Sequence, residues 1–454
     1  MDSPPNAGMM NASGHALPLF TDLYELTMAA GYHAHRIAGE AVFSVYVRRD
    51  RLPRGFLVAA GLAELLAELA EFRFRAPDIA YLEASGLFPR AFLDFLPQVR
   101  FTGAVRAMPE GTVFFPDEPI LEVTAPILEA QLLETFVLNV LGTETMLASK
   151  AARCVHVAGG RPLVDFALRR TQGLDAGMKF ARASHIAGFV ATSNVLAGRT
   201  YGIPVSGTMA HSFVTAFDSE ADAFRAYAEL FPASSTFLID TYDTLDGARI
   251  AARVGREMAE HGRRLQGVRL DSGDMVELSR QVRAILDAEG LADVKIFASS
   301  GFDEFKIAET LAAGAPIDGF GVGTQTGVSA DMPFLDIVYK LVSFAGRPIR
   351  KFSPGKATLA GAKQVFRRTD GQGCLVQDII GTAEETVADA VPLLRTVMAG
   401  GKIVRELPDL KAVRDRCRRQ LSMLDDRFKK IHEPDVYPVS ISPALKAFQP
   451  EPMD

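Results

Sequence analysis

From about residue 160 onward, short apolar runs alternate with helical patterns, and this alternation constrains the fold more than any other feature of the sequence. The runs are RPLVDFA, GIPVSG, STFLID, GVRLDSGD, VKIFASSG and DGFGVGT. Several are separated by segments of helical periodicity such as GARIAARVGREMAEHG and MVELSRQVRAILDAEG. Repeating units of roughly 25–40 residues predict a parallel sheet, which is either closed into a (β/α) barrel or doubly wound.

A parallel barrel holds its working residues at the carboxyl ends of its strands. At these places the sequence becomes polar, or rich in glycine in the last run. The positions are Asp165, Arg169, Thr208, His211, Asp240, Arg269, Asp271, Ser299, Ser300, Gly321 and Gly323. We therefore expect a functional site at this end of the barrel.

The first 150 residues mix helix and strand patterns. LYELTMAAGYHAH and GLAELLAELAEF have helical spacing, and AVFSVYVR alternates as a strand does. A single long helix is expected in PILEAQLLETFVLNVLGTETMLASKAAR. The N-terminus lacks the basic start and apolar core of a secretory signal, and we expect a loose tail there.

Composition excludes several classes of partner. The formal net charge is −6 with both signs spread along the chain, so neither nucleic acid nor an anionic membrane is expected as a main partner. No run of about 18 apolar residues occurs that could span a membrane. The three cysteines are odd in number and widely spaced, which predicts neither a disulfide framework nor a metal cluster and fits a reducing cytoplasm.

Arginines at strand ends indicate an anionic ligand. Arg269 lies inside an apolar strand, where it forms either a structural ion pair with Asp271 or Asp274 or a fork for a carboxylate or phosphate. Arg48 and Arg49 close FSVYV, and Arg169 follows VDFAL. The glycine-rich GFGVGT and ATLAGAK are either phosphate-binding segments or ordinary turns.

His211, in GTMAHSFV, is either structural or chemical. A lone histidine is usually structural, but at a strand end it can act as a base or as a nucleophile that accepts a phosphoryl group. Asp240, in LIDTYD, is the expected partner of its ring. Spacing leaves both roles open.

Metal ligands are not identifiable from the sequence. It contains no HxxxH or CxxC pair, and His33 and His35 lie two apart, which is wrong for one helical face. A catalytic zinc is therefore not expected. A magnesium ion brought in by a phosphorylated substrate stays open.

Nine motifs occur together and in order: DLYELTMAAGY, VYVRR, DFALRRTQGLDAG, ATSNVLAG, PVSGTMAHSFV, LIDTYDT, GVRLDSGD, GVGT and ATLAGAKQVFR. With them the chain resembles the nicotinate phosphoribosyltransferases of the type II phosphoribosyltransferase group. The resemblance implies that nicotinate and 5-phosphoribosyl 1-pyrophosphate give nicotinate mononucleotide and pyrophosphate. It also implies ATP hydrolysis coupled through a phosphohistidine at His211, Mg²⁺ as the companion of ATP, and a cytoplasmic homodimer with shared active sites.

The resemblance further implies an irregular TIM-like (β/α) barrel and a second α/β domain built from the N- and C-terminal segments. The expected division is a flexible tail at 1–18, an N-terminal α/β domain at 19–150, the barrel at 151–350, and a C-terminal segment at 351–454 that packs on the N-terminal domain.

Individual roles follow from the same resemblance. The catalytic group would be His211, Asp240, Arg269 and Asp271. Phe166 would stack on the pyridine ring, Tyr24 of a neighbouring subunit would form the second aromatic wall, and Arg269 would bind the pyridine substituent near Thr208. The ribose and phosphate groups would be held by Arg169, Asp240, Asp271, Gly321, Gly323, Arg48, Arg49, Thr358 and Lys363, with Arg48 and Arg49 acting across the dimer interface.

Ser193 bears on the choice between acid and amide. Nicotinamide-using relatives resemble this chain in the barrel motifs but have an aspartate here. An aspartate would repel the nicotinate carboxylate by about 4 kcal/mol at ~4 Å and an effective dielectric of ~20. Serine is neutral and can donate a hydrogen bond, so Ser193 with Arg269 favours the acid unless Ser193 is only a turn residue.

Three alternatives stay open at this point. The first is a nicotinamide phosphoribosyltransferase. The second is a sugar-phosphate aldolase or isomerase on the same barrel, with Lys295 as its Schiff-base lysine. The third is a non-catalytic nucleotide sensor, which would be expected to lose His211 or Arg269, although both are present.

Overall fold

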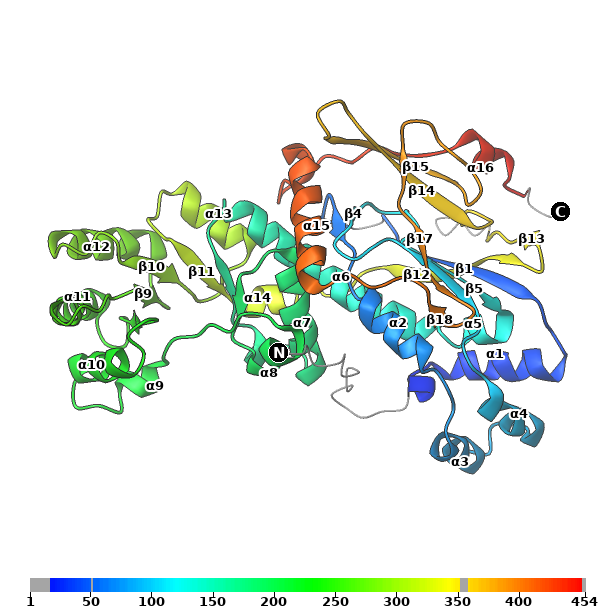
Figure 1. Cartoon of the computed structure of the whole chain (residues 1–454), viewed down its shortest axis with the longest axis horizontal. Coiled ribbons are helices and arrows are strands. Elements are labelled where there is room, and N and C mark those ends of the chain that lie inside the picture. The colour runs from blue at the N-terminus through cyan, green and yellow to red at the C-terminus, as the bar shows by residue number, and fades with distance from the viewer. Residues whose placement is uncertain (1–16, 50–51, 352–357, 451–454) are drawn as a thin grey trace. The chain divides into compact units, whose positions relative to one another are not determined.

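The computed structural model describes residues 17–49, 52–351 and 358–450, and the chain forms two compact units (Figure 1). The larger unit combines the residues up to Ser149 with those from Met332 onward, and the smaller unit is Lys150–Asp331. The expected tail at 1–18 lies outside the described residues except for its last two positions, which begin η1 (Leu17–Leu19).

The smaller unit is built on a six-stranded parallel sheet. Its strands are β6 (Leu163–Asp165), β7 (Ala191–Thr192), β8 (Thr236–Leu238), β9 (Gly267–Leu270), β10 (Lys295–Ala298) and β11 (Gly319–Val322). The order in the sheet is β7-β6-β11-β10-β9-β8. Eight helices follow these strands: α7 (Leu174–Ala187), α8 (Val195–Tyr201), α9 (His211–Val214), α10 (Glu220–Leu230), α11 (Thr244–Glu260), α12 (Met275–Ala288), α13 (Glu304–Ala312) and α14 (Thr324–Gly327).

The sheet curls but stays open over the described residues. β11 pairs with β6, so the last strand of the unit lies beside the first, and Val205 extends the β7 edge through a single bridge to Thr192. No ladder in the described part joins this edge to β8. The smaller unit is therefore a curled parallel half-barrel within a mixed α/β fold. This agrees with the α/β class and the parallel strands expected of an irregular TIM-like barrel, but a full barrel is not confirmed for the described residues. Only a bridge forms at GIPVSG because Pro204 has no N–H to donate to a ladder.

Aspartate caps fix the turns that follow three neighbouring strands. The carboxylates of Asp243, Asp274 and Asp303 each accept hydrogen bonds from two backbone N–H groups in the first turn of α11, α12 and α13, at 2.9 to 3.1 Å. An N-cap of this kind stabilises a helix by about 1 kcal/mol. The caps therefore define where each helix begins and hold the short loops at the carboxyl ends of β8, β9 and β10.

The described residues of the larger unit form three further sheets. A seven-stranded sheet has the order β13-β12-β1-β5-β3-β17-β18, a four-stranded sheet the order β16-β14-β15-β19, and β2 pairs with β4. The strands are β1 (Glu40–Val47), β2 (Leu57–Val58), β3 (Ala104–Ala107), β4 (Val113–Phe114), β5 (Leu121–Pro126), β12 (Ile337–Phe344), β13 (Arg347–Pro348), β14 (Lys363–Thr369), β15 (Leu375–Thr382), β16 (Val391–Pro392), β17 (Arg395–Ala399), β18 (Lys402–Ile403) and β19 (Val439–Ile441). The main helices are α1 (Leu23–Ala34), α2 (Leu62–Ala70), α3 (Ala76–Ala84), α4 (Arg90–Phe95), α5 (Ile127–Gln131), α6 (Glu134–Val157), α15 (Leu410–Met423) and α16 (Pro443–Ala447).

Strands from both ends of the chain share the seven-stranded sheet. β12 pairs antiparallel with β1, and β17 pairs antiparallel with β3. Residues 332–350, which the sequence assigns to the barrel, group with the N-terminal residues instead, because β12 completes their sheet. The single long helix expected after Pro126 is divided into α5 and α6. Within the described ranges, no helix is long and apolar enough to cross a membrane.

Candidate functional site

The carboxyl ends of the six parallel strands lie at one edge of the sheet, and the residues that follow them form the candidate site. Phe166 follows β6, Ser193 follows β7 and Asp271 follows β9, while Asp240 lies two residues beyond β8. Gly323 follows β11, and Thr208 and His211 come after the bridge residue Val205. The structure thus brings the predicted residues of this unit to the same end of the sheet.

Side chains that follow the Val205 edge contact side chains of β9 and of the loop after β8 at this end. His211 Nδ1 lies 3.1 Å from Thr241 Oγ1, and the Arg269 guanidinium donates a hydrogen bond to Thr208 Oγ1. His211 and Thr208 follow the Val205 edge, whereas Thr241 follows β8 and Arg269 belongs to β9. The loops therefore converge here although no ladder closes the sheet.

Asp271 lies between the histidine and the arginine. Its Oδ2 is 3.8 Å from His211 Nε2 and 4.0 Å from a terminal nitrogen of Arg269, and its Oδ1 accepts a hydrogen bond from Ser299 Oγ at 2.5 Å. The hydroxyl of Ser299 therefore fixes a carboxylate that faces two groups able to carry positive charge.

Asp240 does not contact the His211 ring, contrary to the sequence-based expectation. Its Oδ2 accepts hydrogen bonds from the Asp271 N–H at 2.9 Å and from Ser272 Oγ at 2.5 Å, so this oxygen is committed to the neighbouring loop. The imidazole is instead flanked by Thr241 and Asp271. The His211 side chain is 45% exposed, which leaves it accessible to solvent.

The Arg269 side chain is buried, and one of its N–H groups has no hydrogen-bond acceptor among the described residues. Its side chain is 12% exposed, its Nε has no hydrogen-bond partner among the described residues, and its guanidinium carbon lies 6.0 Å from the centroid of the Phe166 ring. Burial lowers the pKa of the guanidinium, and nearby Asp271 and Asp240 oppose this shift. A buried cation beside an aromatic face suits a planar ring that bears an anionic group.

The glycines of GFGVGT make room for Phe166. A Cβ at Gly321 would lie 2.5 Å from carbons of the Phe166 ring, and one at Gly323 would lie 3.2 Å from the Phe166 carbonyl oxygen. Close packing of Phe166 on β11 therefore accounts for both glycines. Arg169, on η3 (Leu168–Arg170), is exposed, and its positive charge further lowers the pKa of Arg269, so the two cations lie near each other.

Two buried carboxyl groups near the strand ends have raised pKa values. Burial raises the pKa of Asp165 to about 6, although Thr192 Oγ1 and the Ala167 N–H donate hydrogen bonds to it. Burial, followed by the charges of Asp240, Asp243 and Asp246, raises the pKa of Glu220 to about 7. One oxygen each of Glu220 and Asp240 has no hydrogen-bond partner in the described part of the chain.

Sequence reasoning missed Thr241 and Glu220. Thr241 adjoins Asp240 in LIDTYD, so the motif contained a hint of it. Glu220 merely follows the N-cap Ser219, and no pattern in the sequence separates it from an ordinary first-turn glutamate.

The remaining predicted site residues belong to the larger unit. Tyr24 is 46% exposed on the first turn of α1, Arg48 pairs with Asp336 at 3.2 Å, and Arg49 pairs with Asp117 at 3.4 Å. Their approach to the site of the smaller unit stays a prediction.

Thr358 and Lys363 are buried. Thr358 Oγ1 accepts a hydrogen bond from the Lys351 N–H at 3.1 Å. Lys363 Nζ donates to the carbonyl oxygens of Leu359 and Gly361 and lies 3.6 Å from Glu122 Oε1. In this structure the ammonium is buried and bound within its own unit, so a contact of Lys363 with a phosphate stays a prediction.

Three family models match the chain in order. Residues 19–142 match the nicotinate phosphoribosyltransferase N-terminal domain, residues 162–369 the nicotinate phosphoribosyltransferase family, and residues 386–449 the nicotinate phosphoribosyltransferase C-terminal domain. Together these models cover most of the described sequence.

Individual relatives agree over nearly the whole length. The nicotinate phosphoribosyltransferase pncB2 of Mycobacterium tuberculosis is 50% identical over 434 residues, covering 94% of this chain and 92% of the relative. The nicotinate phosphoribosyltransferase of Bacillus subtilis is 37% identical over 458 residues, covering 94% and 93%. The crystal structure of human nicotinic acid phosphoribosyltransferase superposes with a TM-score of 0.83 at 32% identity, covering 94% of this chain and 98% of the human chain.

Proposed function

The chain belongs to the nicotinate phosphoribosyltransferase family, and we propose that it makes nicotinate mononucleotide and pyrophosphate from nicotinate and 5-phosphoribosyl 1-pyrophosphate, coupled to ATP hydrolysis. The observation that carries this proposal is that the guanidinium of Arg269 lies beside the Phe166 ring. This guanidinium is buried, and its Nε has no hydrogen-bond partner among the described residues. Nicotinate has a flat ring for the phenylalanine and a carboxylate for the arginine.

In the proposed reaction the pyridine nitrogen bonds to C1 of the ribose as the bond from C1 to the pyrophosphate oxygen breaks. Positive charge builds on the ribose during this exchange. The carboxylates of Asp240 and Asp271, at adjacent strand ends, would stabilise that charge. Phe166 and Arg269 would hold the pyridine so that its nitrogen faces the ribose, which lowers the entropic part of the barrier.

ATP would act through His211. Because Thr241 contacts Nδ1, the nitrogen that remains to accept a phosphoryl group is Nε2. That nitrogen faces Asp271 at 3.8 Å. A phosphoryl group there would oppose the Asp271 carboxylate, so we infer that phosphorylation shifts the loop after β9 and with it the affinity for 5-phosphoribosyl 1-pyrophosphate.

Magnesium fits the residues as an ion that the phosphorylated substrates bring in. Among the residues with described positions, no group of three or more His, Cys, Asp or Glu side chains forms a metal site. Mg²⁺ binds through one or two carboxylates together with substrate phosphates and water. The unpartnered oxygen of Asp240 and the carboxylate of Asp271 would hold it, and the ion would neutralise charge on the diphosphate.

Product analysis tests the proposed function. Incubation with 5-phosphoribosyl 1-pyrophosphate, Mg²⁺, ATP and either nicotinate or nicotinamide is expected to give nicotinate mononucleotide, with kcat/KM at least ~10²-fold higher for the acid, or about 2.7 kcal/mol in the transition state. Equal kcat/KM values for acid and amide would contradict this assignment.

Ser193 offers a matched pair of variants for the same measurement. The residue is half-buried directly after β7, and its hydroxyl has no partner within the described ranges. Ser193→Asp places a negative charge where the nicotinate carboxylate is expected, so the preference for the acid should narrow or reverse. Ser193→Ala is the neutral control and should keep most of the preference for nicotinate over nicotinamide.

An exposed apolar face on α1 supports a homodimer. Leu23, Tyr24 and Met28 on α1 and Phe20, three residues before the helix, are each between 38% and 54% exposed. Neighbouring apolar side chains of this size are usual at interfaces. We propose that Tyr24 contributes to the site of the partner subunit.

Subunit mixing tests the shared site. Tyr24→Ala and His211→Ala homodimers are expected to be inactive alone in ATP-coupled synthesis. Mixing the two should restore part of the activity, because hybrid dimers contain one site with both native residues. Absence of recovery, when subunit exchange is shown by differently tagged chains, would overturn the shared-site proposal.

A further inference from the structure

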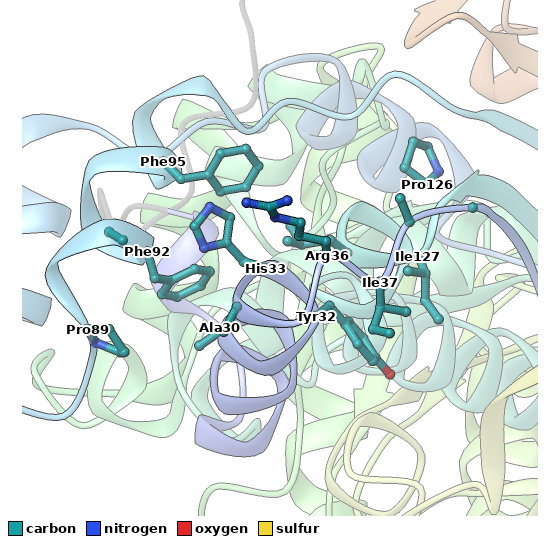
Figure 2. A pocket seen from close by; sticks show the side chains of 15 residues that line it. Ala30, Tyr32, His33, Arg36, Ile37, Pro89, Phe92, Phe95, Pro126 and Ile127 are labelled. Atoms are coloured by element: carbon teal, nitrogen blue, oxygen red, sulfur yellow. The ribbon is translucent and has the colours of Figure 1, made fainter.

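The larger unit contains a pocket of about 630 Å³ between the C-terminal end of α1, α4 and the start of α5 (Figure 2). Pockets of ~300–1,000 Å³ accommodate small organic ligands. No residue in this pocket belongs to the site described above.

Three side chains supply the polar groups of this pocket. Tyr32, His33 and Arg36 line it, and over the described parts of the chain none of their side-chain oxygen or nitrogen atoms makes a hydrogen bond or ion pair. No aspartate or glutamate lines the pocket. A guanidinium offers five N–H donors and no acceptor, so this set of groups complements an anion.

Aromatic rings form one wall of the pocket. The His33 ring stacks on Phe95 with centroids 4.6 Å apart and an angle of 28°, and lies 5.9 Å from the Phe92 ring. Figure 2 shows these three rings on one side of Arg36, with Ile37 and Ile127 on the other side. A flat apolar body fits between such walls, because aromatic faces stack and aliphatic side chains exclude water.

The backbone at Arg36 indicates that its side chain matters. The Ile37 N–H donates to the Tyr32 carbonyl and the Arg36 N–H to the His33 carbonyl, which ends α1 with Arg36 at a φ of 53°. Glycine is the usual residue at this left-handed position, because it adopts the conformation without strain. A strained residue that lines a pocket points to a role for the side chain there.

We propose that this pocket binds a planar aromatic anion, with its ring against His33 and Phe95 and its carboxylate, sulfonate or phosphate group on Arg36. The proposal does not depend on the catalytic activity of the chain. It rests on the unpartnered donors, the absence of acidic lining residues and the stacked rings.

Two dyes that differ by one group test this proposal on the full chain. 1-Anilinonaphthalene-8-sulfonate has an aromatic body and an anionic group, and N-phenyl-1-naphthylamine lacks the sulfonate. In calorimetric titrations, Arg36→Gln should weaken binding of the sulfonate about tenfold, as expected for the loss of a charge-assisted hydrogen bond, and leave the neutral dye within about twofold. Phe95→Leu should weaken both dyes.

Arg90→Gln is the matched control. Arg90 is an exposed arginine on α4 that pairs with Glu83 and Asp94 and does not line the pocket. This variant should bind both dyes as the parent chain does. An unchanged affinity for the sulfonate in Arg36→Gln, an equal loss of both dyes, or no binding of the sulfonate by the parent chain would each overturn the proposal.

Arg36→Gly separates binding from folding. Glycine relieves the left-handed backbone, so this variant should unfold about 2 °C higher than the parent chain while binding the sulfonate as weakly as Arg36→Gln does. A glycine variant that keeps the parent affinity for the sulfonate would show that Arg36 is not the anion ligand.

Discussion

Replacing Arg269 by glutamine is expected to lower kcat/KM for nicotinate by about 10²- to 10³-fold, or roughly 3–4 kcal/mol. Arg269 is buried and its Nε has no hydrogen-bond partner among the described residues. A carboxylate bound there would lose its water, so its binding would depend on the charge of this arginine. Glutamine keeps a donor and much of the length of the side chain but has no charge. The measurement is steady-state kinetics with nicotinate and with nicotinamide.

The ratio of kcat/KM for nicotinate to kcat/KM for nicotinamide shows whether Arg269 binds the carboxylate. Because nicotinamide is neutral, its kcat/KM should fall much less in Arg269→Gln than that of nicotinate, and the preference for nicotinate should shrink. Arg249→Gln is the control, since Arg249 is exposed on α11 and pairs with Asp246. If kcat/KM falls by the same factor for nicotinate and for nicotinamide, Arg269 does not bind the carboxylate.

The strand-end residues could be predicted because a buried strand has a recognisable end. In GVRLDSGD and STFLID the apolar run stops at a polar residue, and in the structure β9 and β8 end within two residues of Asp271 and Asp240. Five of the six predicted runs became strands. Local periodicity is sufficient for this, because each parallel strand is buried by its own flanking helices.

The partner of His211 could not be predicted from the sequence. Asp240 and Thr241 are adjacent, and successive residues of an extended segment point to opposite sides. Which of them faces the histidine depends on how the loop after β8 turns toward α11. In the structure Asp240 binds the loop of the next strand, and Thr241 is left to contact the ring.

Pairings between distant segments also lie beyond sequence reasoning. β1 pairs with β12 and β3 with β17, although the whole smaller unit lies between the strands of each pair in the sequence. Nothing in either strand specifies such a partner, since any strand with one apolar face can complete a sheet. The open edge between Val205 and β8 is equally a property of the whole sheet.

Replacing His211 by asparagine is expected to abolish phosphorylation of the chain by ATP. The asparagine side chain can still hydrogen-bond to Thr241, but it has no ring nitrogen to accept a phosphoryl group. ATP hydrolysis and the stimulation of synthesis by ATP should both disappear. A slow synthesis of nicotinate mononucleotide without ATP should remain, because Phe166, Arg269 and Asp271 are unchanged.

The label left by γ-labelled ATP is the deciding observation. A phosphoryl group on an imidazole nitrogen is lost in acid and survives base, whereas phosphate esters of serine or threonine behave in the opposite way. His261→Asn is the matched control, because His261 is exposed at the end of α11 and its Nδ1 contacts only the Glu257 carbonyl. This control should be labelled as the parent chain is.

Measuring both the label and the stimulation by ATP in His211→Asn separates two mechanisms. ATP acts either by binding alone or by phosphorylating His211, and kinetics of the parent chain cannot distinguish these. If His211→Asn is unlabelled yet still stimulated, ATP acts by binding alone, and the inferred repulsion between a phosphoryl group and Asp271 is wrong. An acid-labile, base-stable label on His211→Asn would place the phosphoryl group on another histidine. Loss of both label and stimulation is the result expected if the phosphorylated ring shifts the loop after β9, since ATP can favour a conformation only as far as that state binds substrate better.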